Sequence, residues 1–172
     1  MMTVPQILAQ VVAIVIIILM AIGAQSKTQK MFLFFQLVAN ALYGVHYGLL
    51  SKMTAVVISG ICVVRTLIFF LYNRENKKVP IWLLITIFAV VIGAGVVTWE
   101  NWLSIIPILA TIVFTYGQWQ RDVRVTKKTV ITGDFGWIVY NAFCSGYMDI
   151  AGKIVEITSC AIALRRDKSV EE

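Results

Sequence analysis

The sequence predicts an all-α, polytopic membrane protein with seven transmembrane helices. Of its 172 residues, 59% are apolar and only 14% are charged, whereas soluble domains carry about 25% charged residues. The mean hydropathy is +0.84, so lipid rather than water is the expected main solvent. Runs of roughly 20 apolar residues, the length that crosses a bilayer as a helix, recur along the chain between clusters of charge.

These apolar runs place seven predicted spans along the chain. They cover residues 5–24, 31–50, 54–73, 80–98, 102–119, 130–147 and 150–166. Little sequence remains for a soluble module, so residues 1–172 are expected to form a single transmembrane domain. The first span has no Lys or Arg ahead of it and no small-residue cleavage site after it, so we expect it to be kept rather than removed as a signal peptide.

The sixth span is the weakest on hydropathy, because it contains several small or polar residues: Gly133, Asp134, Gly136, Asn141 and Ser145. Leaving it out would give six spans with both termini on one side. Cytoplasmic segments are enriched in Lys and Arg, and the seven-span topology with an outer N-terminus satisfies this rule. Twelve of the 15 basic residues then fall on the cytoplasmic side: Lys27, Lys30, Arg74, Lys77, Lys78, Arg121, Arg124, Lys127, Lys128, Arg165, Arg166 and Lys168. We therefore expect a multi-pass protein of the cell inner (plasma) membrane, with its N-terminus outside and its C-terminus in the cytoplasm.

The net charge of +6 follows from this topology and needs no nucleic acid to explain it. The basic stretch 121–128 has no interleaved aromatic residues, and the chain has no room for a nucleic-acid-reading module. Anionic lipid headgroups are the expected partners of the basic residues.

Aligning the chain with itself at an offset of 97 residues indicates an internal repeat. The offset places Lys30 on Lys127 and Tyr43 on Tyr140, and the second and third spans on the sixth and seventh. The first and fifth spans also share a proline followed closely by Ile-Leu-Ala. Two three-helix units can share one orientation only if an odd number of helices joins them, as in transporters with parallel repeats.

The predicted arrangement is therefore 3+1+3. Residues 1–73 form the first three-helix repeat, residues 80–98 form the linker helix, and residues 102–168 form the second repeat. The linker is the only span with no charged and no strongly polar residue. The alternative is that any two apolar hairpins of similar length align this well.

Polar and aromatic residues follow one face of the second span and the corresponding face of the sixth. On the second span they are Gln36, Asn40, Tyr43, Gly44 and Tyr47, and on the sixth they are Gly133, Trp137, Tyr140, Asn141 and Cys144. The candidate substrate-binding residues are Asn40, Tyr43, Trp137, Tyr140 and Asn141, since amide, phenol and indole groups facing one another suit an uncharged polar solute. The alternative is that these groups hold helices together, a common use of polar residues in membranes.

Charged side chains inside the spans, with the sole histidine, are the candidates for a transport pathway or for polar pairing: His46, Arg65, Asp134, Lys153 and Glu156. A charge within a membrane is costly and needs a partner. Lys153 and Glu156 are spaced i, i+3 and are expected to pair on their own helix. Arg65 is the natural cross-repeat partner of Asp134, although their estimated depths differ by about two helical turns. We expect structural pairing for Lys153, and either pairing or substrate and proton handling for Arg65 and Glu156.

His46 is expected about one helical turn below the outer surface, pointing away from the face of Asn40. A lone histidine can relay protons, but no second histidine or cysteine stands at metal-ligand spacing, so neither a metal nor a cofactor is predicted. The cysteines lie apart in apolar stretches, without a CxxC pair: Cys62, Cys144 and Cys160. No GxSxG, HExxH or phosphate-binding glycine loop is present, so the protein is not expected to be an enzyme. An intramembrane enzyme would require His46 to meet Glu156 or Asp134, and only Glu156 has a compatible depth.

Two stretches carry a family resemblance. Residues 36–66 read QLVANALYGVHYGLLSKMTAVVISGICVVRT, and residues 137–165 contain Trp-x-x-Tyr-Asn followed by Ser-Gly-Tyr. They resemble the two halves of bacterial inner membrane proteins of the YgjV family. The resemblance implies an inner-membrane location and names no substrate. The 3+1+3 layout is in turn similar to the architecture of SWEET-type sugar facilitators and PnuC-type nicotinamide-riboside carriers, and fold analogy alone does not establish function.

The sequence thus favours a small carrier or facilitator that moves an uncharged or polar small metabolite by alternating access between two three-helix bundles. The alternative is a non-transporting scaffold or sensor that binds a partner through its basic cytoplasmic loops. A carrier needs a hydrated central cavity lined by the polar faces, whereas a scaffold can close those faces into helix contacts. A homo-oligomer is left open, because lipid or a second copy can cover the broad apolar faces equally well.

Overall fold

The chain is all-α in the computed structural model, which describes residues 4–51, 53–97, 99, 102–143 and 147–168. The described residues form seven α-helices and one short 3-10 turn. The elements are α1 (Val4–Ala24), α2 (Gln29–Leu49), α3 (Met53–Arg74), α4 (Ile81–Val97), η1 (Trp102–Ser104), α5 (Ile105–Trp119), α6 (Val123–Phe143) and α7 (Tyr147–Lys168). The predicted helix count and order are therefore confirmed.

The start of α6 differs from its predicted position. The helix begins at Val123 rather than at residue 130 and ends at Phe143, so the basic run that was expected in a loop lies largely in its first turns. The Asp122 carboxylate accepts a hydrogen bond from the backbone N–H of Arg124 at 2.8 Å, which satisfies one of the free donors at a helix start. Lys127 is completely buried. Hydropathy alone does not detect a helix that begins with charged residues.

Within the described ranges, three segments are long and apolar enough to cross a membrane by their length and composition: α1, α2 and the continuous stretch Trp102–Trp119. Helix α4 is a shorter apolar helix, with 17 residues. The other helices carry more polar and charged residues, and α6 combines Lys127, Lys128 and Asp134 with three glycine or asparagine positions: Gly133, Gly136 and Asn141.

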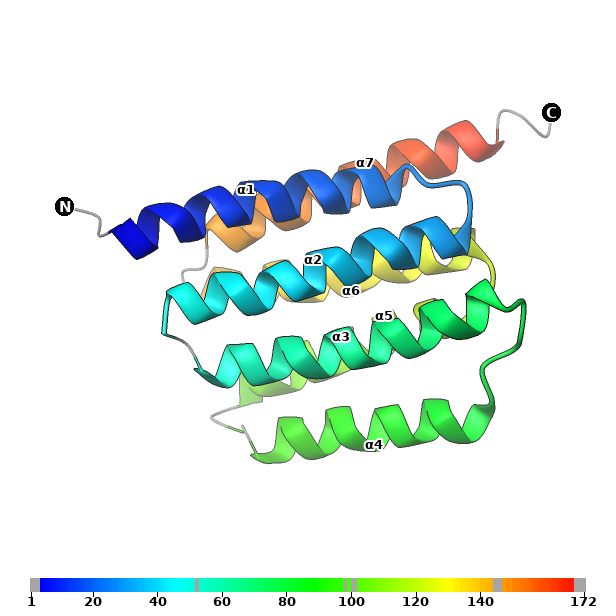
Figure 1. Ribbon diagram of the computed structural model, residues 1–172, viewed down its shortest axis with the longest axis horizontal. Helices are drawn as coiled ribbons and strands as arrows, with labels where there is room; N and C mark the ends of the chain where they lie inside the picture. Colours follow the sequence, from blue (N-terminus) through cyan, green and yellow to red (C-terminus); the bar gives the residue numbers. More distant parts are fainter. Residues whose placement is uncertain (1–3, 52, 98, 100–101, 144–146, 169–172) are drawn as a thin grey trace.

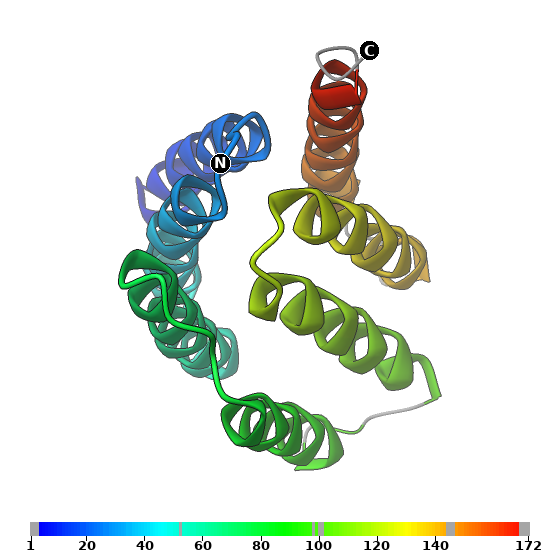
Figure 2. The same cartoon turned by 90° about the vertical axis from the view of Figure 1, so that its right-hand side faces the viewer.

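The helices lie nearly parallel in two layers, with the N-terminus and the C-terminus at opposite ends of the bundle (Figure 1). Viewed along the helices, α1, α2 and α3 form one layer and α7, α6 and α5 form the other (Figure 2). Helix α4 lies at one edge of the bundle, beside α3 and α5. The order along the chain thus gives three neighbouring helices, one helix at the edge, and three more neighbouring helices.

Helix α4 is attached to this edge mainly by apolar contacts. Leu84 and Ile87 of α4 belong to the same buried cluster as Leu33 and Phe69. At the start of α4, the indole N–H of Trp119 donates a hydrogen bond to the carbonyl of Val79 at 2.9 Å. Burial of large apolar side chains is worth roughly 1.5–3 kcal/mol each, so these contacts hold α4 in place without charged groups.

The bundle places apolar side chains outside and many polar ones inside. Exposed large apolar residues run along whole helix faces, as in α1, where they include Ile7, Leu8, Val11, Ile14, Val15, Ile18 and Ile22. The buried polar and charged residues are Gln29, Gln36, Asn40, Ser59, Arg65, Thr66, Thr115, Gln118, Thr126, Lys127, Asp134, Asn141 and Glu156. Polar residues facing the interior of an apolar helix bundle are typical of membrane proteins.

Helices α5 and α6 approach each other through small residues. A Cβ added at Gly117 would collide with the side chain of Thr129, and one added at Gly133 would lie 3.1 Å from the carbonyl oxygen of Ala110. Small residues let membrane helices pack closely. Gly117 and Gly133 therefore allow the close approach of α5 and α6.

Candidate solute-binding cavity

A cavity of about 460 Å³ lies between the two helix layers. Its described wall comes from α1, α2 and α3 on one side and α5, α6 and α7 on the other, while α4 contributes none of it. Sites for small molecules commonly have volumes of about 300–1,000 Å³. The size and the two-sided wall suit one small solute held between the layers.

Helix α2 contributes the predicted face to this cavity. Gln36, Asn40, Tyr43 and Tyr47 all line it, whereas Gly44 does not. The amide of Asn40 donates a hydrogen bond to the Thr66 hydroxyl at 3.1 Å, which fixes the side chain. The Tyr43 and Tyr47 rings stack with their centroids 5.9 Å apart. This wall is both polar and aromatic.

Helix α6 contributes part of its predicted face. Gly133, Trp137 and Asn141 line the cavity, but Tyr140 is not among the lining residues. Its ring meets that of Trp137 edge to face, with centroids 5.9 Å apart, so Tyr140 contacts the indole rather than the cavity. The expected place of Tyr140 in the wall is therefore wrong. Cys144, the last residue of the predicted face, lies outside the described residues.

Several lining groups have free hydrogen-bonding capacity. Among the residues that the structure describes, no hydrogen bond joins another group to the amide of Gln36, the amide of Asn141 or the indole N–H of Trp137. Gln36 and Asn141 are only 6% and 8% exposed, and both line the cavity. Buried polar groups are normally hydrogen-bonded. These groups can therefore bind a solute or water.

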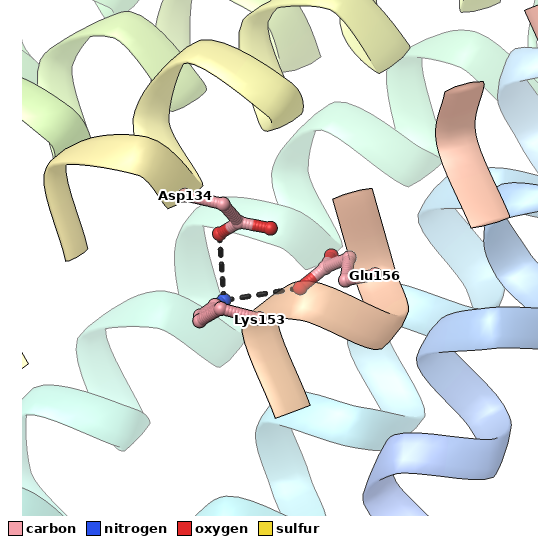
Figure 3. A network of polar contacts seen from close by, with 3 residues as sticks. All are labelled: Asp134, Lys153 and Glu156. Carbon is pink, nitrogen blue, oxygen red and sulfur yellow. Dashed lines mark hydrogen bonds and ion pairs between the residues drawn. The ribbon is translucent and has the colours of Figure 1, made fainter. Parts of the chain in front are cut away.

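A charged cluster lies on the α6–α7 side of the cavity. The Lys153 ammonium is 2.8 Å from the Asp134 carboxylate and 3.0 Å from the Glu156 carboxylate, so Lys153 bridges the two acids (Figure 3). The predicted pair of Lys153 and Glu156 is confirmed. The predicted pair of Arg65 and Asp134 is wrong, because Lys153 projects from the neighbouring helix directly against Asp134.

Arg65 has a different environment, on the opposite side of the cavity. Its Nη1 donates to the Thr115 hydroxyl at 2.9 Å, and its guanidinium lies 5.6 Å from the centre of the Phe114 ring. The residue is 5% exposed and lines the cavity. Its Nε is buried and has no hydrogen-bond partner in the described part of the chain. Arg65 thus joins α3 to α5 through a neutral hydroxyl.

His46 lies at the edge of the cavity wall. Its Nδ1 is 2.9 Å from the carbonyl oxygen of Ala9; because a carbonyl only accepts, Nδ1 donates this bond. The ring contacts Tyr47 edge to face, and His46 lines the cavity with Tyr47. The expectation concerned the Asn40 face, and His46 lines the cavity from outside that face, because the cavity covers a wider arc of α2. No group of three metal-binding side chains occurs within the described ranges.

Polar contacts join the two layers at one end of the cavity, where α1 ends and α2 begins. The Thr126 hydroxyl donates to the Gln29 side chain at 2.9 Å, and the Gln29 amide donates to the carbonyl of Gln118 at 3.3 Å. The Gln25 amide donates to the carbonyl of Ser159 at 2.9 Å. We name Gln25, Gln29, Gln118, Thr126 and Ser159 the polar end. The sequence does not single out this set: Gln25, Gln29, Gln118 and Thr126 lie near predicted span ends, and Ser159 lies in the middle of the seventh predicted span.

The cavity extends away from the polar end. Its wall includes Leu50 at the C-terminal end of α2, Ile58 in α3 and Asp149 in the first turn of α7. Asp149 is exposed. The cavity is thus bounded by direct hydrogen bonds at one end and reaches an exposed carboxylate at the other.

A comparison with known families gives a match over nearly the whole chain. The model of the Imp-YgjV family, described as bacterial inner membrane protein, matches residues 7–170. This finding confirms the family resemblance of the two sequence stretches. Searches of curated proteins and of solved structures found no match.

Proposed function

The chain belongs to the Imp-YgjV family of bacterial inner membrane proteins, and we propose that it is a carrier or facilitator for a small polar metabolite. The observation that carries this proposal is the cavity between the two layers. In its wall the amides of Gln36 and Asn141 and the indole of Trp137 have no hydrogen-bond partner among the described residues. Asn40, Tyr43, Trp137 and Asn141 bind the solute in this proposal. Tyr140 holds the Trp137 ring by an edge-to-face contact.

The proposal includes a 3+1+3 arrangement in which α1–α3 and α5–α7 are parallel repeats. The contact between Gln29 and Thr126 supports it, because these residues are 97 positions apart and correspond under the offset that aligns the repeats. When a two-fold axis relates two repeats, a residue close to that axis lies next to its counterpart in the other repeat. The position of α4 at the edge, outside the cavity wall, supports its role as a linker.

We also propose that all seven helices cross the membrane, with the N-terminus outside and the C-terminus in the cytoplasm. The two termini lie at opposite ends of the bundle, as an odd number of crossings requires. The polar end then faces the cytoplasm and the cavity opens outward. Alternating access requires the polar end to separate while the opposite end closes, which has to break its hydrogen bonds and part the apolar cluster that includes Phe32 and Val130.

The test is the thermal stability of the purified protein with a panel of sugars, nucleosides, vitamins and amino acids. A binding solute should raise the melting temperature of the wild type and not that of an Asn40→Ala, Asn141→Ala double variant. Uptake of that solute into proteoliposomes should then exceed uptake into empty liposomes. If no solute on a broad panel shifts the wild type, the carrier proposal fails and the alternative of a scaffold that presents basic residues to a partner gains ground.

A further inference from the structure

Arg65 lines the cavity, and the described residues provide no counterion for its guanidinium. No carboxylate of a described residue lies within ion-pair distance of it, and its side-chain partner is the neutral hydroxyl of Thr115. A guanidinium has five N–H donors, and the buried Nε of Arg65 has no partner within the described ranges. An uncompensated buried charge strongly destabilises a protein. An anionic group of a bound molecule would compensate it.

The cluster on the opposite side has the reverse imbalance. Asp134 and Glu156 provide two carboxylates for the one ammonium of Lys153. The second oxygen of Asp134 is buried and has no hydrogen-bond partner in the part of the chain that the structure describes. Asp134, Lys153 and Glu156 all line the same cavity as Arg65. A cationic group of a bound molecule would compensate this cluster.

We infer that the solute is a small dipolar ion, whose anionic group binds Arg65 and whose cationic group binds the Asp134–Lys153–Glu156 cluster. This inference rests on the proposed carrier function and names its substrate class. A neutral solute leaves both charges uncompensated, and a simple anion or cation compensates one and is repelled by the other. A solute with both charges is neutral overall and matches both walls of the cavity.

Cys62 allows the field of Arg65 to be measured without a known solute. It lines the cavity and precedes Arg65 by one helical turn. The measurement uses a Cys144→Ala, Cys160→Ala background and two methanethiosulfonate reagents, one with a sulfonate group and one with a trimethylammonium group. Each reaction rate with Cys62 is divided by the rate of the same reagent with 2-mercaptoethanol, and the rate ratio is the sulfonate value over the trimethylammonium value. This ratio should exceed one in the wild type. Arg65→Gln should lower this rate ratio by about tenfold, as expected for the loss of one nearby charge in a partly screened site. Arg65→Lys should preserve the ratio.

Matched probes then test the substrate class. The ω-amino acids from glycine to 6-aminohexanoate vary the distance between the two charges, and each is compared with its amide and with the acid that lacks the amine. At least one member should raise the melting temperature at a concentration about tenfold lower than either singly charged analogue, since each analogue lacks one of the two charge-assisted hydrogen bonds. Arg65→Gln should abolish this preference for the dipolar form.

The outcomes separate the inference from the proposed function. Stabilisation by uncharged sugars or nucleosides that is equal in the wild type and Arg65→Gln, with an unchanged Cys62 rate ratio, overturns the inference and leaves a carrier. If Cys62 reacts with neither reagent and no solute stabilises the protein, the cavity is closed to water. This result overturns both the inference and the proposed carrier function. A dipolar probe that stabilises the wild type, together with a Cys62 rate ratio that falls about tenfold in Arg65→Gln, supports both.

Discussion

The two ends of the cavity differ in how the helix layers meet. At the polar end, side-chain amides and hydroxyls join the layers directly, as in the Gln29–Thr126 and Gln25–Ser159 contacts. At the opposite end the cavity wall includes the stacked rings of Tyr43 and Tyr47 and the exposed Asp149. The closed end is held by these polar contacts together with a buried apolar cluster from both layers, whose members are Ala24, Phe32, Val123, Val130 and Cys160. Opening this end therefore has to separate both kinds of contact.

The largest expected effect comes from locking the polar end. In a variant without native cysteines, Gln29→Cys with Thr126→Cys should be joined by a short bifunctional thiol reagent, because the two side chains are in contact. Uptake of the solute found by the stability panel should fall to that of empty liposomes, since the polar end can no longer separate. Binding should persist. Each single-cysteine variant treated alike is the control, and full uptake by the crosslinked protein would show that this end does not open.

The next largest effect should come from Lys153, on the cavity side of α7. Lys153→Met leaves Asp134 and Glu156 buried without their cation, and breaking a buried ion pair in this way costs about 3–5 kcal/mol. The apparent free energy of unfolding in detergent should fall by that order. Lys128→Met, at an exposed position of α6, should change it little. Adding Asp134→Asn and Glu156→Gln to Lys153→Met should recover much of the loss, and no recovery would argue against an electrostatic cause.

A smaller effect is expected where α5 and α6 meet near the polar end. Gly117→Leu forces a side chain into the space of Thr129, and overpacking of this kind typically costs 1–3 kcal/mol. Gly93→Leu is the matched control, because a Cβ at Gly93 meets nothing within 4 Å. Thermal unfolding in detergent measures both. Equal melting temperatures for the two variants would show that the close approach of α5 and α6 is not needed for stability.

The helix pattern and the α2 face of the cavity were predictable from the sequence, because apolar runs and helical periodicity are local. The start of α6 was not, since its first turns carry Arg124, Lys127 and Lys128 and resemble a loop by hydropathy. The partner of Asp134 was not predictable either. Lys153 lies on a different helix, and only the packing of α6 against α7 brings its ammonium within 2.8 Å of the acid.

The polar end shows the same limit. Gln29, Gln118 and Thr126 are polar residues on three different helices, and nothing local in the sequence indicates that they meet. Only the repeat offset, which pairs Gln29 with Thr126, carries a signal for their contact. Long-range contacts of this kind depend on how the two layers are placed, which periodicity does not specify.

The smallest expected effect comes from removing one hydroxyl at the polar end. Thr126→Val deletes a hydroxyl that lies 2.9 Å from the Gln29 side chain in the other layer and 2.6 Å from the carbonyl oxygen of Gly117 in its own layer. The bond across the layers is worth about 0.5–1.5 kcal/mol. Thr132→Val is the control, because its exposed hydroxyl bonds only the carbonyl of Lys128 on its own helix among the described residues. Gln118 is 2% exposed, so a Gln118→Cys reporter should react slowly with a thiol reagent added to inverted membrane vesicles.

Thr126→Val should raise that labelling rate about tenfold at most, in proportion to the added population of molecules with a separated polar end. Thr132→Val should leave the rate unchanged. If Gln118→Cys is labelled at the same rate with and without Thr126→Val, this hydrogen bond does not affect the equilibrium between joined and separated layers. Their separation at this end would then depend on the contact of Gln25 with Ser159. Gln25→Leu in the same reporter removes the amide that bonds both the carbonyl and the hydroxyl of Ser159, and it would be the variant to raise the labelling rate.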